Sequence, residues 1–307
     1  MAFSTPASDT SLPTPGGAAL TLPRGVARGS SLWRDAWRRL LRNKLAVVGG
    51  VVVILLCLLA IFADLIAPQS YTKPNFGRLY EFPSREFPLG TDQLGRDVLS
   101  RLIYGARVSM LVGIGAQIII VLIGVPIGAV SGFVGGRTDL ILTRFVDVMY
   151  AFPSLLFVIL VMSMLGAGLM NIFIALGLTG WVGIARQTRA QVLSIKEKEF
   201  VEGARALGAG FWRVMSRHVL PSALTPIVVS ITFGIPQAIF TEAALSFIGV
   251  GINPPTPSWG QMVGENQQFL RSYWHLCVFP SIAIAVTMLS FTFFGDGVRD
   301  ALDPKLK

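Results

Sequence analysis

The hydrophobic positions of this chain gather into six long apolar segments separated by polar stretches. About 20 apolar residues in a helix cross the hydrocarbon core of a bilayer, and five of the six segments reach that length. The remaining one is shorter and carries three glycines, but a glycine-rich turn separates it from the segment before it. The pattern predicts an all-α polytopic membrane protein with six transmembrane helices, at Leu45–Ala67, Val108–Val134, Phe145–Leu165, Leu169–Ile184, Ala223–Ile248 and Trp274–Phe294.

Composition supports the same class of protein. Of the 307 residues, 52% are hydrophobic and only 14% are charged, whereas soluble domains carry about 25% charged residues. The two cysteines, Cys57 and Cys277, lie in apolar segments and indicate no disulfide framework. Soluble, fibrous, disordered and disulfide-rich classes are therefore excluded.

The sequence carries no recognisable catalytic or nucleotide-binding motif. It has no G-x-x-x-x-G-K-S/T loop to hold ATP phosphates, no H-E-x-x-H and no G-x-S-x-G. Its two histidines, His218 and His275, are far apart in sequence, which argues against a metal site. We therefore expect a non-catalytic chain that binds no cofactor and no metal.

Basic residues are distributed unevenly around the predicted spans. Six spans place both termini on one side of the membrane, and that side takes 19 of the 26 lysines and arginines. Because cytoplasmic segments are enriched in basic residues, both termini are predicted to be cytoplasmic. This bias also accounts for the net charge of +9 without a nucleic-acid partner.

The predicted topology divides the chain into successive parts. Trp33, Trp37, Leu40 and Leu41 recur at helical spacing among arginines, which is typical of a short helix lying on a membrane surface. We expect a disordered cytoplasmic tail at 1–30, an amphipathic cytoplasmic helix at 31–44 and the first span at 45–67. An external segment follows at 68–107, with an interfacial helix over 91–107. The core at 108–297 holds five spans and a cytoplasmic loop at 187–221, and residues 298–307 form a cytoplasmic C-terminal tail.

The second span carries a stripe of glycines. Gly124, Gly128, Gly132 and Gly136 follow one another in G-x-x-x-G steps. Such a stripe lets a second helix approach closely where lipid supplies no hydrophobic drive. It is either a seam along which helices slide or an ordinary tightly packed contact, and both interpretations predict a face between helices.

The cytoplasmic loop contains a short predicted helix. Residues around Glu202 favour helix, and Gly208 suits the left-handed conformation that ends one. A second helical stretch follows near Phe211–His218, and Pro221 is expected to limit its continuation. A helix held in this way fits a groove on another protein, although an ordinary connecting loop explains the pattern equally well.

Glu242 lies late in the fifth span, where a carboxylate is costly unless it faces water, a partner or a protein interior. It either lines a transport path or ties this span to a neighbour, and we favour the second because a structural pair satisfies the same requirement. Four neutral side chains are candidates for weak contacts along a path: Gln117, Gln237, Thr241 and Ser246.

These features resemble a known family. Glu202-Gly-Ala204, three residues, Gly208, nine residues and His218-Val-Leu-Pro221 resemble the "EAA" loop of ABC importer permeases, with Gly203 and His218 as departures from its pattern. Three further segments and Asn43-Lys44 resemble the dipeptide/oligopeptide permease subfamily: Leu89–Arg107, Pro254–Gly260 and Gly295–Pro304. Together they cover almost everything from Ser31 onwards and point to the C-type permease subunit of peptide importers.

The resemblance implies a type I ABC importer permease fold in the bacterial inner membrane. It implies a heterodimer with a B-type permease, two cytoplasmic ATPases that hold ATP and Mg, and an external peptide-binding protein. The residues assigned to ATPase coupling are Glu202, Gly203, Ala204, Arg205, Ala206, Leu207, Gly208, Leu220 and Pro221.

Other functions stay open at this point. Within the same family, nickel chelates, glutathione or peptide-like antibiotics are alternative cargoes, although no Cys/His cluster favours a metal. An ion-coupled secondary transporter is a further alternative, but the chain has no obvious internal repeat. A structural membrane anchor for a soluble enzyme is the third, and the polar, glycine-rich spans argue weakly against it.

Overall fold

The computed structural model describes residues 32–302, so the expected tail at 1–30 and the last five residues of the expected C-terminal tail lie outside them. Within the described range the regular structure is helical, and a single isolated β-bridge joins Thr91 to Asp97. The helices are α1 (Leu32–Arg42), α2 (Lys44–Ile61), α3 (Ala63–Ile66), α4 (Val98–Val134), α5 (Gly136–Ala151), α6 (Ser154–Leu165), α7 (Leu169–Lys196), α8 (Glu199–Ala206), α9 (Phe211–Val214), the π turn η1 (Met215–Val219), α10 (Leu220–Phe247), α11 (Trp259–Asn266), the 3-10 turn η2 (Gln267–Phe269) and α12 (His275–Leu302).

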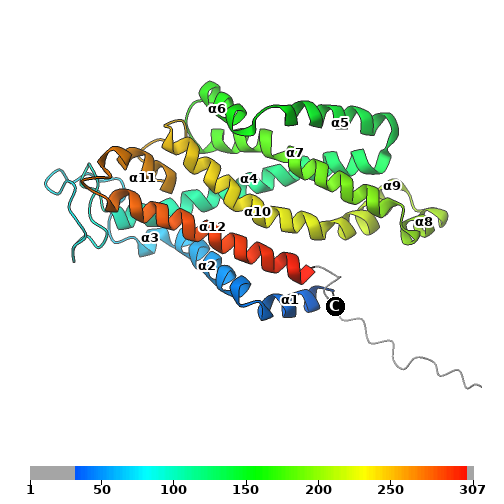
Figure 1. The fold of residues 1–307 in the computed structure, drawn as a ribbon, viewed down its shortest axis with the longest axis horizontal. Coiled ribbons are helices and arrows are strands. Elements are labelled where there is room, and N and C mark those ends of the chain that lie inside the picture. Colours follow the sequence, from blue (N-terminus) through cyan, green and yellow to red (C-terminus); the bar gives the residue numbers. More distant parts are fainter. Residues whose placement is uncertain (1–31, 303–307) are drawn as a thin grey trace, which may run out of the picture.

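Long helices running side by side form the body of the molecule (Figure 1). The central pair is α4 and α7, with α10 and then α12 and α2 on one side. The bent pair α5 and α6 lies on the other side. Helix α11 and the loop that precedes α4 lie at one end. Helices α1 and α8 and the end of α12 lie at the opposite end. Both ends of the described chain and the predicted coupling helix therefore share one end of the molecule.

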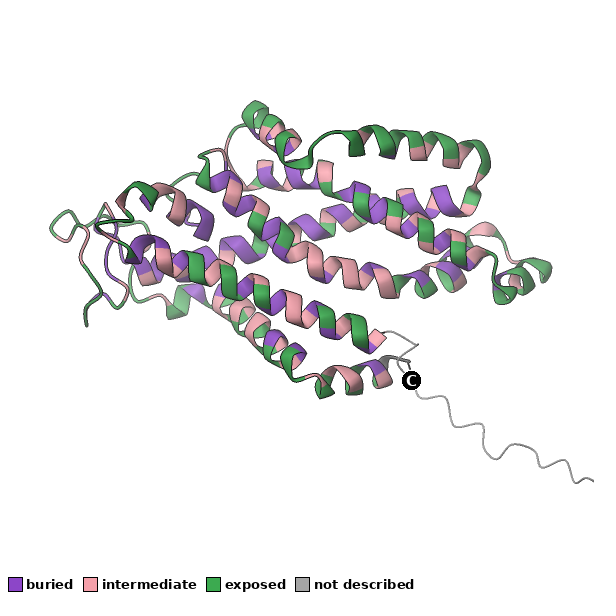
Figure 2. Ribbon diagram, viewed as in Figure 1, coloured by how far each residue is buried: buried purple, intermediate pink, exposed green. Residues whose placement is uncertain are grey.

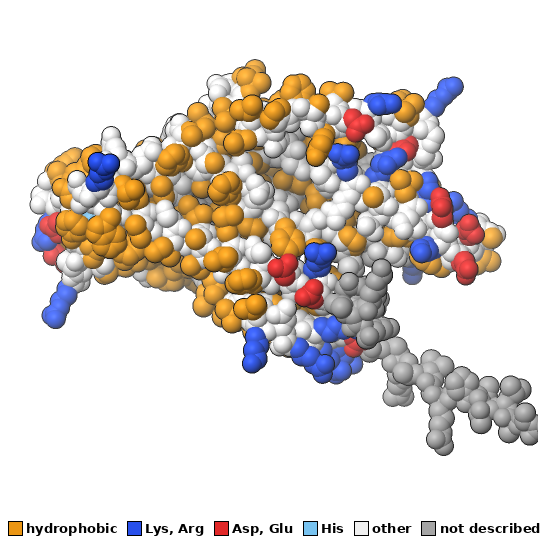
Figure 3. All heavy atoms as spheres, in the orientation of Figure 1, with side chains coloured by type: hydrophobic (Ala, Val, Ile, Leu, Met, Phe, Trp, Pro, Cys, Tyr) orange, Lys and Arg blue, Asp and Glu red, His pale blue; other side chains and the backbone are white. Residues whose placement is uncertain are grey.

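Apolar side chains cover much of the face seen in Figure 3, and Figure 2 shows exposed positions along most of the helices. Ile54 of α2, Leu122 of α4 and Ile141 of α5 are each more than half exposed. Monomeric soluble proteins rarely expose apolar surface on this scale. Five helices are long and apolar enough to cross a membrane, and the α5–α6 pair supplies a sixth if it counts as one span. This arrangement agrees with the predicted six-span protein.

The third span is bent rather than straight. The axes of α5 and α6 differ by 83° across Phe152 and Pro153. A residue before proline is driven out of the helical region by the proline ring, and Phe152 has an extended backbone (φ −81°, ψ 132°). The continuous helix predicted over Phe145–Leu165 is therefore wrong.

The separate interfacial helix expected over 91–107 is also wrong. Residues 91–97 form a tight loop, and Val98 begins the 37-residue helix α4, which continues into the second span. The Asp97 carboxylate accepts a hydrogen bond of 2.8 Å from the backbone N–H of Ser100, so Asp97 caps this helix. The helix therefore begins seven residues after the start of the expected interfacial helix at residue 91.

Three boundaries at the other end of the molecule differ from expectation. The predicted loop 187–221 begins too early, because α7 continues to Lys196 with Val192 and Ile195 buried. Pro221 does not end the helix before it. The π turn just ahead of the proline changes the hydrogen-bond register, so α9, η1 and α10 run on without a break. Finally, α12 extends to Leu302, past the predicted start of the tail at 298.

The Pro-rich loop at 253–259 leads into a helix that the sequence did not indicate. This helix, α11, begins after Ser258, whose hydroxyl accepts from the Gln261 backbone N–H while the Gln261 side chain accepts from the Ser258 N–H. This reciprocal capping box fixes the start of α11. Trp259 is buried, and its indole N–H donates 3.0 Å to the carbonyl of Leu102 in α4. The loop is thus a docked element rather than a free turn.

Candidate translocation cavity and coupling loop

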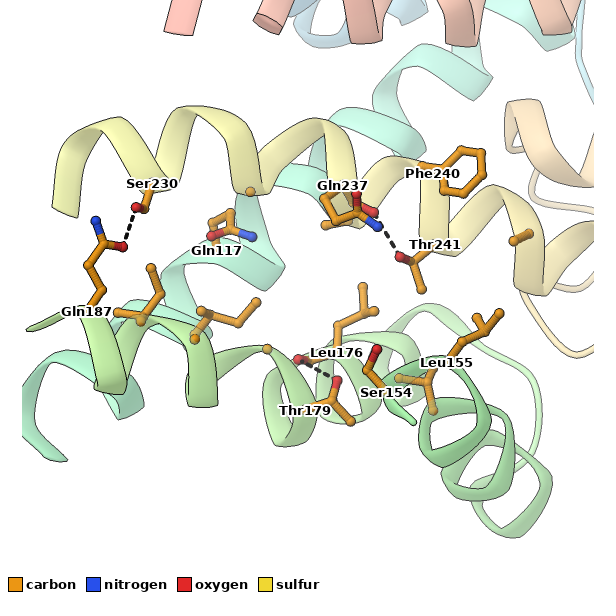
Figure 4. A pocket seen from close by; sticks show the side chains of 18 residues that line it. Gln117, Ser154, Leu155, Leu176, Thr179, Gln187, Ser230, Gln237, Phe240 and Thr241 are labelled. Atoms are coloured by element: carbon orange, nitrogen blue, oxygen red, sulfur yellow. Dashed lines mark hydrogen bonds between the residues drawn. The ribbon is translucent and has the colours of Figure 1, made fainter. Parts of the chain in front are cut away.

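A cavity of about 470 Å³ opens between α4, α6, α7 and α10 (Figure 4). Its walls are apolar, with isolated neutral polar groups from each helix. No charged side chain lines it among the residues that the structure describes. The polar residues in its wall are Gln117, Ser154, Thr179, Gln187, Ser230, Gln237 and Thr241.

Three of the four neutral side chains suggested from the sequence line this cavity. Gln117, Gln237 and Thr241 lie in its wall, whereas Ser246 lies elsewhere and donates 2.7 Å to Glu242. Gln187 was missed because it follows the end of the fourth span as predicted. Ser230 has no charge or motif that would single it out within an apolar helix.

A polar bridge joins α7 and α10 at one end of the cavity (Figure 4). The Ser230 hydroxyl donates to the side-chain carbonyl of Gln187, and the Gln187 amide donates 3.1 Å to the backbone carbonyl of Pro226. These are also the helices that lead into and out of the cytoplasmic loop as predicted. The helices α7 and α10, which lead into and out of that loop, therefore connect the loop to the cavity.

Glu242 is fully buried and does not line the cavity. One of its oxygens accepts hydrogen bonds of 2.7 Å from both Ser246 and Ser258. Ser258 is the residue that caps α11, so the carboxylate connects α10 to α11. This geometry supports the interpretation that Glu242 ties its span to a neighbour.

Glu242→Ala is expected to destabilise the protein by about 1–3 kcal/mol, because it leaves two buried hydroxyls without their acceptor. The relative uptake of different peptides should not change, since the carboxylate lies outside the cavity. Thermal unfolding of the purified protein and competition uptake measure the two effects. Glu242→Gln, which keeps an acceptor oxygen, serves as the milder control. Normal stability with altered peptide preference would contradict this assignment.

The short helix predicted around Glu202 is present as α8, which starts at Glu199. Glu202 is exposed in its first turn, where a negative charge favours the helix dipole. Val201 is buried in the hydrophobic cluster below α8 and holds α8 against it. Gly208 has φ +80°, the left-handed conformation that ends a helix, and a Cβ there would meet nothing within 4 Å.

The other residues assigned to coupling occupy different environments. Gly203 has open space around it, and the Arg205 guanidinium lies 4.7 Å from the ring centre of Phe133. Leu207 is 91% exposed at the tip of the loop. Ala206 ends α8, Ala204 packs in part on the cluster below, and Leu220 and Pro221 lie at the start of α10 rather than in the loop.

Three of the four stripe glycines lie against α7. A Cβ on Gly128 would come within 2.3 Å of the Ala185 carbonyl oxygen, and Gly124 and Gly132 are similarly close to α7 backbone oxygens. Gly136 is not part of this contact. It begins α5 with φ +56° and has nothing within 4 Å of a Cβ position. The seam is therefore shorter than the stripe.

A buried charge cluster, unforeseen from the sequence, holds together the elements at the end of the molecule opposite α8. Arg101 donates 2.7 Å to Asp92 and 3.0 Å to Glu265, and Arg96 donates 2.7 Å to the same Asp92 oxygen. The two arginines are almost fully buried. Burial raises the pKa of the Glu265 carboxyl, although the Arg96 charge acts in the opposite direction. The cluster joins the loop before α4 to α11.

The structure offers no obvious metal centre. Among residues 32–302, no group of three or more His, Cys, Asp or Glu side chains is placed to hold an ion. Cys57 and Cys277 are both free thiols.

Comparisons with known proteins cover the whole core of the chain. Residues 124–307 match the family described as binding-protein-dependent transport system inner membrane component. Residues 31–83 match the N-terminal transmembrane domain of oligopeptide transport permease C.

Individual relatives match over nearly their full length. The oligopeptide transport system permease protein OppC of Bacillus subtilis is 45% identical over 90% of this chain and 91% of its own. The dipeptide permease DppC of the same species is 44% identical, over 90% of this chain and 87% of its own. The glutathione transport system permease GsiD of Pectobacterium atrosepticum is 40% identical, over 94% and 96%.

Among solved structures, an inward-facing form of the MetNI methionine ABC transporter contains a chain of similar fold. The TM-score is 0.56 at 17% identity, and the match covers 66% of this chain and 96% of that one. At this identity the likeness concerns the fold alone. The chain therefore belongs to the family of binding-protein-dependent transport system inner membrane components, and it is a multi-pass inner membrane permease with the type I ABC importer fold.

Proposed function

We propose that this chain is one of two membrane subunits of an ATP-driven importer of dipeptides or oligopeptides. A B-type permease is its membrane partner, two cytoplasmic ATPases hold ATP and Mg, and an external peptide-binding protein delivers the cargo. The names of the relatives OppC and DppC support the peptide cargo. GsiD supports glutathione, itself a small peptide, as a second candidate within the same class.

One observation supports the coupling role most strongly: α8 is exposed and lies in the chain between α7 and α10, two of the four helices that line the cavity. α7 leads into α8, and α9 with α10 leads out of it. A displacement of α8 by an ATPase therefore acts on α7 and α10 together, and these helices are joined across the cavity by Gln187 and Ser230. The cavity forms this subunit's half of the path.

The same arrangement supports the proposed orientation. Both ends of the described chain lie at the end of the molecule that carries α8 (Figure 1), and the segments predicted to lie on that side of the membrane hold 19 of the 26 lysines and arginines. We therefore place both termini and α8 in the cytoplasm, and the loop before α4 with α11 outside.

Site-specific cross-linking in native membranes tests this assignment. Leu207→Cys at the tip of the coupling loop should cross-link to an ATPase subunit, and the purified complex should contain two ATPases and a second permease. Phe76→Cys is the matched control, because Phe76 is also exposed, at 70%, but lies in the loop before α4. A chain that purifies without ATPases, or equal cross-linking from both positions, would contradict the proposal.

A further inference from the structure

One side chain in the cavity wall is a buried amide without a partner. Gln117 of α4 is 6% exposed, and neither its oxygen nor its nitrogen makes a hydrogen bond to any residue that the structure describes. Its amide points into the space between α7 and α10 (Figure 4). Both polar atoms of the amide keep some exposure to the cavity, so a polar molecule inside the cavity can supply the partners that the protein does not.

The backbone of α10 fixes where this amide lies. A Cβ at Gly234 would fall 2.5 Å from the side-chain carbonyl carbon of Gln117, so the amide rests directly on the glycine. A residue with a side chain at position 234 would occupy this place. The absence of a side chain on α10 thus makes room for a polar group on α4.

The neighbouring polar groups are already engaged. Thr179 and Thr241 donate to carbonyls of their own helices, and Ser230 donates to Gln187. Gln237 and Ser154 also line the cavity but are exposed. Gln117 is therefore the buried group in this wall that is free to bind a passing molecule.

We propose that the Gln117 amide pairs with a main-chain peptide group of the transported peptide; this rests on the proposed function. A primary amide offers one acceptor oxygen and N–H donors, which match the N–H and C=O that every peptide unit carries. The cavity has no charged side chain to select cargo side chains or termini. Gln117 accordingly recognises the backbone and accepts peptides of different sequence.

The test compares trialanine with an analogue in which the peptide nitrogen of the middle alanine is methylated. Both are tested with the complete complex in vesicles. Methylation removes the N–H group that donates a hydrogen bond to the Gln117 side-chain oxygen. Gln117→Met retains a similar length without hydrogen-bonding groups, and it should lower the uptake ratio of trialanine to its analogue about fivefold, the value of one neutral hydrogen bond. Discrimination by the binding protein is the same in both complexes and cancels from this comparison.

Two further variants make the result decisive. Gly234→Ala displaces the amide without removing it, so the ratio should fall in this variant also, even if Gln117→Met assembles poorly. Thr287→Val, in α12 and outside the cavity, should leave the ratio unchanged, because its hydroxyl donates to the Ala283 carbonyl of its own helix. If the wild type takes up trialanine but the ratio is unchanged in both Gln117→Met and Gly234→Ala, this inference is overturned and the proposed function is not. Absence of ATP-driven trialanine uptake by the wild type would overturn the proposed function with it.

Discussion

Gly208→Val is expected to reduce coupled peptide uptake at least tenfold while leaving the spans inserted. Gly208 has φ +80°, and a β-branched residue in that conformation is a strained outlier. A Cβ would meet nothing within 4 Å, so the effect comes from the backbone and not from a clash. The helix after the glycine, which leads into α10, should be misdirected. Uptake in vesicles and ATP hydrolysis by the same complex measure the coupling.

Two companion variants sharpen this test. Glu202→Lys reverses a charge in the first turn of α8 and should likewise separate hydrolysis from uptake. Gly203→Ala is the matched control, since this glycine also has open space around it but lies within the helix. Alanine favours helix over glycine by about 1 kcal/mol, so uptake should be retained. Full uptake with normally coupled hydrolysis in Gly208→Val and Glu202→Lys would exclude this loop as the coupling element.

Arg101→Met should destabilise the protein by about 3–5 kcal/mol, which is the usual cost of removing one member of a buried charge group. The substitution leaves Asp92 with Arg96 alone and deprives Glu265 of its closest cation. The contact between α11 and the loop that precedes α4 should therefore be the first to be lost on unfolding. Thermal unfolding, together with protease sensitivity of that loop, measures the loss.

The control for this variant is Arg78→Met. Arg78 also pairs with two carboxylates, Glu81 and Glu86, but its side chain is 42% exposed. Exposed ion pairs contribute little, so its unfolding temperature should hardly change. Equal destabilisation by the two substitutions would contradict the structural role of the buried cluster.

The number of apolar helices was predictable because each long apolar segment has few alternatives to a membrane span. The left-handed glycine at 208 was also predictable, since its position after a helical run is a local signal. The bend at Pro153 had a signal too, because proline displaces the residue before it from the helical region, but the apolar run hid it.

Features that depend on contacts between distant segments were not predictable. The Arg101–Glu265 pair joins residues 164 positions apart, and neither sequence neighbourhood indicates the other. The contact between Gly234 and the Gln117 amide is likewise set by the approach of α4 to α10. Gln117 was a candidate from its polarity alone; its burial and its lack of a partner required the fold.

The central claim is that this permease imports peptides at the expense of ATP. The most direct measurement uses vesicles containing the complete complex, with trialanine and the binding protein on the side of α11 and ATP on the side of α8. Trialanine should accumulate against its gradient, dependent on ATP and insensitive to ionophores that collapse ion gradients. Accumulation that proceeds without ATP and disappears when an ion gradient is collapsed would contradict it.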